Sequence, residues 1–97
     1  MQQIERKLIE AAIVEAAKVG FHAYQVNDGG DNVPAQTVAE VVEVLTDSIT
    51  HASIHFKHED GRRAWLFVVL GNGEDCLADH SVTPDFSEAM DRACFAE

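Results

Sequence analysis

The chain has 97 residues, of which 46% are hydrophobic and 25% are charged, and its formal net charge at pH 7 is −10. Its length predicts a single domain spanning 1–97, with an apolar content ordinary for a globular protein. Seventeen acidic residues against seven basic ones argue against direct nucleic-acid binding and against an anionic membrane surface, because both need clustered Lys and Arg. No apolar run approaches the roughly 20 residues of a transmembrane helix, and the N-terminus lacks a signal-peptide pattern, so a cytoplasmic location is expected.

The first half of the chain predicts a helix, a strand and a second helix. Apolar residues at helical spacing predict the first helix over 2–19, which Gly20 would end. A short strand over 21–26 and the turn cluster 27–31 follow. The second helix is expected to open at Pro34, since proline suits the first helical position. Its apolar face would consist of Val38, Val41, Val42 and Leu45.

The clearest strand pattern lies over 49–58, where polar and apolar residues alternate. Asp60-Gly61 follows, which is typical of a two-residue type I′ turn, and 62–70 would be the partner strand. A turn of that type fixes the register between the two strands. The pairs it predicts are Phe56 with Trp65, Ile54 with Phe67, and Ala52 with Val69. These pairs would form the apolar face that the helices cover.

A second hairpin signal, Asn72-Gly73, predicts a further strand over 74–81 at the edge of the sheet, with Val68 opposite Leu77. The segment 83–85, Thr-Pro-Asp, predicts the start of a final helix, because it supplies a hydroxyl cap, a proline and an acid. The resulting order is α-β-α-β-β-β-α. It predicts an α+β two-layer sandwich, with a mainly antiparallel sheet of about four strands and helices packed on one face.

The predicted register leaves a second sheet face that is only half polar. Either the C-terminal helix or another molecule would cover it, and an exposed apolar patch is typical of a partner site. This face predicts an alternative function, a homodimeric structural or assembly protein. The residues of that self-association surface would be Leu66, Val68, Leu77 and His55.

No group of residues predicts a catalytic, cofactor or metal site. His51 and His55 would lie about 13 Å apart on a strand, too far to share one metal ion. A metal-dependent enzyme would need four residues to converge from distant segments, and it is the third hypothesis. Those residues are Asp28, Asp75, Asp79 and His80. The two cysteines, Cys76 and Cys94, are expected to be buried, reduced thiols.

The acidic residues suggest a surface for a basic partner. Carboxylates displayed at intervals can imitate the phosphates of a nucleic acid and attract a protein that binds one. The candidates lie on the predicted second helix, the edge strand and the last helix. They are Glu40, Glu43, Asp47, Glu74, Asp75, Asp79, Asp85 and Glu88.

The segment 65–81, with the sequence WLFVVLGNGEDCLADHS, resembles small uncharacterised acidic proteins encoded by tailed phages, prophages and plasmids. The first helix, leading through Gly20 to the Asp-Gly-Gly turn at 28–30, is similar to the same group. His80 stands where that group has an aromatic residue. The resemblance implies a mobile-element origin, and it carries no activity or catalytic residue. The leading hypothesis is therefore a non-enzymatic acidic protein that engages or inhibits a host protein, for example in anti-defence.

Overall fold

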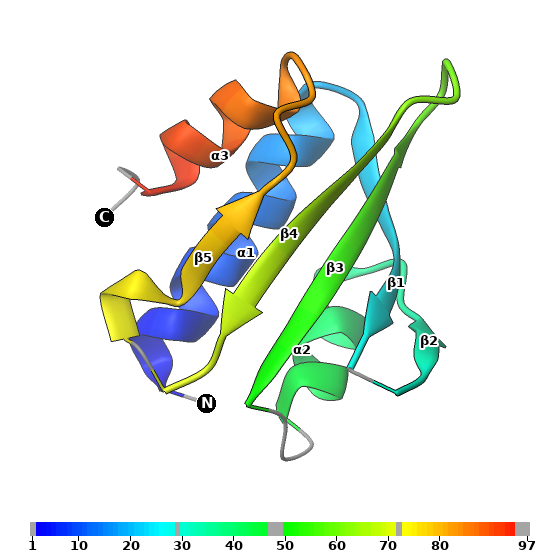
Figure 1. The fold of residues 1–97 in the computed structure, drawn as a ribbon. Helices are drawn as coiled ribbons and strands as arrows, with labels where there is room; N and C mark the ends of the chain where they lie inside the picture. The colour runs from blue at the N-terminus through cyan, green and yellow to red at the C-terminus, as the bar shows by residue number, and fades with distance from the viewer. Residues whose placement is uncertain (1, 29, 47–49, 72, 95–97) are drawn as a thin grey trace.

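The computed structural model describes residues 2–28, 30–46, 50–71 and 73–94, without the side chains of Glu74 and Cys94 (Figure 1). Its three helices are α1 (Gln3–Lys18), α2 (Val38–Thr46) and α3 (Phe86–Cys94). Its strands are β1 (Phe21–Asn27), β2 (Asn32–Pro34), β3 (His51–His58), β4 (Arg63–Val69) and β5 (Leu77–His80), and a 3-10 helix, η1 (Gly73–Asp75), precedes β5. The strands form one antiparallel sheet in the order β2-β1-β3-β4-β5. The predicted α+β class is confirmed, with five strands instead of about four.

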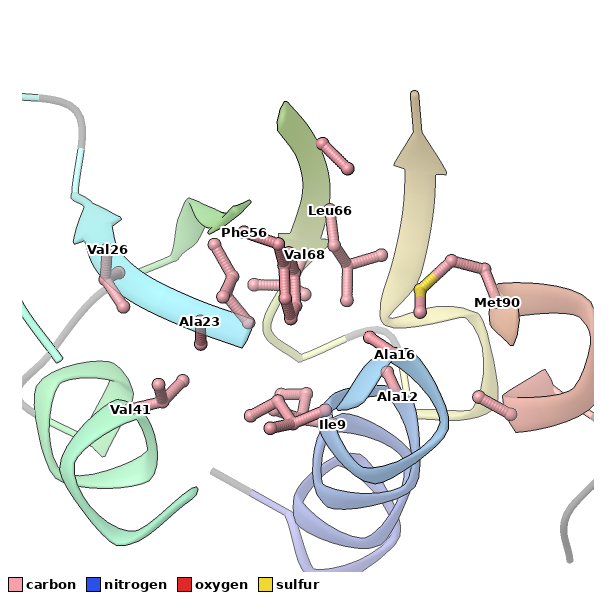
Figure 2. Packing of buried hydrophobic residues seen from close by; sticks show 14 of the residues in the cluster. Ile9, Ala12, Ala16, Ala23, Val26, Val41, Phe56, Leu66, Val68 and Met90 are labelled. Carbon is pink, nitrogen blue, oxygen red and sulfur yellow. The ribbon is translucent and has the colours of Figure 1, made fainter. Parts of the chain in front are cut away.

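All three helices pack against the same face of the sheet, with α1 between α2 and α3 (Figure 2). The core between the two layers is made of aliphatic and aromatic side chains with almost no exposure. Phe86 of α3, for example, contacts the rings of Phe21 and Phe56 at centroid distances of 5.4 and 5.0 Å. Ile9 of α1 and Val41 of α2 are also fully buried. The two-layer arrangement with helices on one face therefore follows the prediction.

The connection from α1 to β1 depends on a glycine, as the sequence predicts. Gly20 has φ +90°, a conformation that L side chains rarely adopt. A Cβ atom at this position would lie only 2.5 Å from Nε2 of His58. The glycine therefore both ends the helix and allows the tip of the β3–β4 hairpin to pack against the turn.

The predicted start of the second helix at Pro34 is wrong. Pro34 lies in β2, an edge strand that pairs with β1 through Gln25, where the missing N–H of proline costs the sheet little. α2 begins at Val38 because Thr37 and Glu40 form reciprocal cap interactions. The Glu40 N–H donates to Thr37 Oγ1 at 3.1 Å, and the Thr37 N–H donates to Glu40 Oε1 at 3.2 Å.

The predicted register of the first hairpin is also wrong, by one residue. The connection is a three-residue loop, 59–61, in which the Gly61 N–H donates to the His58 carbonyl at 2.9 Å. The His58 N–H donates to the Arg62 carbonyl at 2.8 Å, and Gly61 has φ +95°. This is a turn followed by a left-handed glycine, the second common hairpin geometry for such a sequence. The observed pairs are Phe56 with Ala64, Ile54 with Leu66, and Ala52 with Val68.

A shift of one residue moves every side chain of a strand to the other face of the sheet. Leu66 and Val68 therefore point into the core, with 1% and 0% of their surface exposed. Trp65 and Phe67, expected beneath the helices, point away from them. Three predicted pairs are corrected by this observation: Phe56 with Trp65, Ile54 with Phe67, and Ala52 with Val69.

The second hairpin is closer to its prediction. Val68 pairs with Leu77 as expected, and the Val69 N–H donates to the Cys76 carbonyl at 2.8 Å. The strand is shorter than predicted, because η1 occupies the first residues. The pairing with β4 also has a register irregularity between Phe67 and Val68. Cys76 is buried as expected, whereas the side chain of Cys94 lies outside the described residues.

A buried carboxylate holds the β4–β5 connection to α1. Glu5 is fully buried, and its Oε2 accepts hydrogen bonds from the backbone N–H groups of Gly71 and Gly73, while Oε1 accepts one from Gln2. Burial alone would raise the pKa of Glu5, but the three N–H donors outweigh it and lower the pKa below its ordinary value. The ionised carboxylate thus ties two segments that are 66 residues apart.

The last helix begins slightly later than predicted. Pro84 and Asp85 form a turn, with Asp85 at φ +69°, and α3 starts at Phe86. The predicted hydroxyl cap is wrong, because Thr83 Oγ1 forms its hydrogen bonds with the Arg63 carbonyl and with Ser81 Oγ. Thr83 contributes to the start of the helix through its carbonyl, which accepts a hydrogen bond from the Ser87 N–H at 2.9 Å.

Candidate functional site

The sheet has one face that no described helix covers, and we call it the open face. It is defined by the alternation of β1, β3 and β4, in which residues facing the core are buried and their neighbours are not. In Figure 1, α1 and α2 pass behind the strands, so the open face is turned toward the viewer. The open face consists of His22, Tyr24, Gln25, Asn27, His51, Ser53, His55, Lys57, Arg63, Trp65, Phe67, Val69 and Asp79.

Planar rings dominate the centre of the open face. The Tyr24 and His55 rings lie 6.4 Å apart between centroids, and the His51 and Phe67 rings lie 5.9 Å apart. Trp65 lies directly opposite His55 in the β3–β4 register and is 37% exposed. Rings from three adjacent strands therefore share one accessible surface.

Two cations lie side by side at one end of this surface. Lys57 of β3 is directly opposite Arg63 of β4, and His22 of β1 is opposite Lys57. Like charges in directly opposed positions destabilise a sheet. Neither Lys57 nor Arg63 forms an ion pair with a carboxylate in the described part of the chain. The Arg63 guanidinium instead lies 6.0 Å from the centre of the Tyr24 ring.

Cations elsewhere in the structure are mostly paired with acids. Arg6 pairs with Glu10 at 2.9 Å, and Lys18 and Arg92 both pair with Glu15 at 2.7 and 3.0 Å. The contrast matters because the chain has an excess of acidic residues. Leaving two adjacent cations without a carboxylate partner is therefore a specific property of the open face.

The open face carries little negative charge. Among the described acidic residues only Asp79 belongs to it, and one oxygen of Asp79 accepts a hydrogen bond from the His80 N–H at 2.9 Å. Burial lowers the pKa of His55, which favours its neutral form. The surface thus combines planar rings with an adjacent pair of permanently charged side chains, Lys57 and Arg63.

The acidic residues proposed from the sequence do not form one compact patch in the described structure. Glu40 and Glu43 lie on α2, whereas Glu88 lies on α3, and α1 separates the two helices (Figure 2). Glu40 is also engaged as a helix cap, and Asp85 lies 3.9 Å from Arg62.

The remaining acidic candidates are scattered as well. Asp75 lies in η1, and Asp79 lies on the open face. Asp47 and the side chain of Glu74 lie outside the described residues.

The self-association surface predicted from the sequence is wrong in its main members. Leu66 and Val68 belong to the core, and Leu77 is half-buried and packs against the edge of that core. His55 does lie on an uncovered face, but next to Trp65 instead of the leucines. The one-residue shift of β4 is the physical reason for both results.

The structure does not bring together the residues of the metal-dependent enzyme hypothesis. Asp28 follows β1, near the β2 edge of the sheet, whereas Asp79 and His80 lie on β5 at the opposite edge. Asp28 accepts hydrogen bonds from the N–H groups of Gly30 and Asp31, which lower its pKa. Within the described ranges no group of three or more His, Cys, Asp or Glu residues is placed to hold a metal ion.

A groove of about 520 Å³ lies between α1 and α2, in the helical layer. Its lining includes Arg6, Glu10 and Thr46. Arg6 and Glu10 are paired with each other, and the Thr46 hydroxyl donates to the Val42 carbonyl at 2.6 Å. These three groups are occupied within their own helices, whereas Lys7, which also lines the groove, forms no ion pair with a described residue. The groove is the weaker candidate because its described lining contains no aromatic ring.

Of the open-face residues, only His55 and Asp79 were among those proposed from the sequence. The other rings and the two cations were not. A usable signal was present in the first hairpin. Residues 59–61 can form a three-residue loop in which Gly61 takes the left-handed position, and that alternative places Trp65 outside the core.

No family model, curated protein or solved structure matches this chain. In the part of the chain that the structure describes, every helix is too short or too polar to cross a lipid bilayer.

Proposed function

We propose that the chain is a non-enzymatic binding protein that engages its partner with the open face of its sheet. The observation that carries the proposal is the composition of that face, in which uncovered rings adjoin the opposed cations Lys57 and Arg63. Exposed aromatic residues and arginine are typical of binding surfaces. Tyrosine and tryptophan provide large contact areas with little loss of side-chain freedom, and arginine provides several hydrogen-bond donors. The face is also a broad sheet surface, which suits docking better than enclosed chemistry.

This proposal changes the surface assigned from the sequence but keeps the class of function. The acidic residues are divided between α2 and α3, and one of them caps a helix. Negative charge spread over the helical layer is suited to solubility. The mobile-element origin implied by the resemblance stays a prediction, and with it the expectation that the partner comes from a host cell.

The test is a capture experiment with two matched double variants. The immobilised protein is exposed to lysate of its source cells, and the retained material is compared between wild type, Trp65→Ala/Phe67→Ala and Glu43→Gln/Glu88→Gln. The first variant removes rings from the open face, and the second removes charges from the helical layer. Circular dichroism confirms that each variant remains folded.

We expect the wild type and the helical-layer variant to retain the same partner, and the open-face variant to lose it. Equal capture by the open-face variant would contradict the proposal. Loss of capture only in the Glu43→Gln/Glu88→Gln variant would restore the acidic surface as the binding site.

A further inference from the structure

We infer that the open face binds single-stranded nucleic acid, with phosphate groups at the row His22–Lys57–Arg63 and bases stacked on the neighbouring rings. The inference deepens the proposed function, on which it rests. It names the chemistry of the partner from three observations on the open face. These are the arrangement of its residues in rows across the strands, the aromatic character of its apolar surface and its distribution of charge.

The strand registers arrange the open face in rows across the sheet. His22, Lys57 and Arg63 form the first row, because Lys57 pairs with His22 on one side and with Arg63 on the other. His55 and Trp65 form the next row, two residues further along β3 and β4, with Tyr24 beside His55. Residues two apart on a strand are separated by about 6.7 Å. A cationic row thus runs parallel to a row of rings, at a distance that one nucleotide can bridge.

The accessible apolar surface of the central rows is ring surface. Trp65, Phe67 and Tyr24 all lie there, whereas Ile54 and Leu66 face the core. Val69, at the end of β4 opposite His51, adds one aliphatic side chain to the open face. Planar side chains stack on nucleobases with little dependence on sequence, because every base has a flat face. An arginine beside a ring, as Arg63 is beside Tyr24, adds a cationic group that contacts both bases and phosphates.

Binding at the open face departs from the expectation, drawn from composition, that the chain does not bind nucleic acid directly. The reason is that the net charge of −10 is not spread uniformly over the surface. Apart from Asp79, the described acidic residues lie on the helices, on η1, or in the turns. The acids of the helices thus lie on the other side of the sheet. Glu59 and Asp60 lie in the β3–β4 loop, where Asp60 pairs with Arg62, and Lys57 and Arg63 form no ion pair with a described carboxylate. The overall charge still repels phosphates at long range, so the account predicts weak binding that is lost as salt rises.

The experiment uses Trp65 as its probe, since it is the only tryptophan in the chain. The intact protein is titrated at low salt with a thymidine oligonucleotide of about ten residues, and the tryptophan emission is followed. Stacking of a base on Trp65 is expected to quench the emission with saturation. The matched variants are Lys57→Glu and Lys7→Glu, which change the net charge equally. Lys7 lies on α1 and makes no ion pair with a described residue.

We expect Lys57→Glu to weaken binding by about tenfold or more, and Lys7→Glu by less than about twofold. An absence of quenching by the oligonucleotide would overturn the inference, as would equal losses of affinity in the two variants.

Two further measurements distinguish other occupants of the open face. Saturable binding of poly-L-glutamate in place of the oligonucleotide would identify an acidic protein segment as the partner.

A doubled mass in light scattering, with Trp65 shielded before any ligand is added, would identify a second copy of the chain. In either of these two cases the nucleic-acid assignment fails. The proposed function has a separate readout, because it fails only if capture from lysate survives the loss of Trp65 and Phe67.

Discussion

The covered and open faces of the sheet are formed by the same strands, but their side chains differ in burial and in chemical type. On β4 the residues facing the helices, including Leu66 and Val68, are almost completely buried. Their neighbours Arg63 and Trp65 face away from the core. The covered face can be explained entirely by packing. The open face cannot, because opposed cations and exposed rings do not contribute to a core. The core and the proposed binding surface therefore lie on opposite sides of one sheet.

The largest expected effect is on the covered face. Leu66→Ala would remove buried methyl groups and leave a cavity, so we expect the free energy of unfolding to fall by about 3 kcal/mol. Trp65→Ala, one residue away on the other face, is expected to cost less than Leu66→Ala, because its ring is 37% exposed and its removal leaves no enclosed cavity. Urea denaturation measures both. A larger loss for Trp65→Ala than for Leu66→Ala would reverse the assignment of the two faces.

The second effect concerns the buried carboxylate of Glu5, which belongs to the structural side of the comparison. Glu5→Gln would place an amide N–H group against one or more backbone N–H donors, and leaving such a donor unsatisfied costs about 1–3 kcal/mol. We therefore expect a loss of about 2 kcal/mol at pH 7. The exposed control Glu43→Gln should change stability by less than about 0.5 kcal/mol. Similar losses of unfolding free energy for the two variants would show that the hydrogen bonds of Glu5 do not stabilise the fold.

The same carboxylate predicts a pH dependence. Because the pKa of Glu5 is lowered in the folded protein from its ordinary value of 4.5, ionised Glu5 stabilises the fold above that value. The contribution is lost as pH falls through the folded pKa. The gap in unfolding free energy between wild type and Glu5→Gln should therefore narrow as pH falls from 7 to about 3. A constant gap over this range would show that ionisation is not the source of the stabilisation.

The smallest expected effect is on the open face, and it is an increase in the free energy of unfolding. Lys57→Glu would replace the repulsion between Lys57 and Arg63 with an attraction, so we expect the free energy of unfolding to rise by about 0.5 kcal/mol. The same change is expected to weaken oligonucleotide binding. Thermal denaturation and the emission titration, performed on one preparation, measure the two consequences together. A variant that is less stable than wild type would indicate that Lys57 has a structural role.

The fold class could be predicted from the sequence because the helix periodicities and turn residues agree with the packing. α1 and β1 begin and end within one residue or so of their predicted bounds, and Gly20 has the expected positive φ. The short strand β2 was not predicted, since three residues ending in Pro34 have little strand character of their own. They are held by pairing with β1, which is a tertiary effect.

The candidate site could not be predicted because it depends on the length of one turn. Asp60-Gly61 is compatible with a two-residue loop and with the last part of a three-residue loop. Local sequence does not choose between them, but the choice decides whether Trp65 or Leu66 faces the helices. The alternation of β3 was identified correctly, with Ile54 and Phe56 buried. An error of one residue at the turn was sufficient to exchange the two faces of β4.

The most direct test of the central claim is the solvent exposure of Trp65 in the dilute, unliganded protein. Its emission spectrum and its quenching by acrylamide are measured in the native state and after unfolding. The account predicts long-wavelength emission and efficient native-state quenching, because the ring lies on the open face and is 37% exposed. Short-wavelength emission with little quenching at low protein concentration would place Trp65 beneath the helices, and it would contradict both the register and the site built on it.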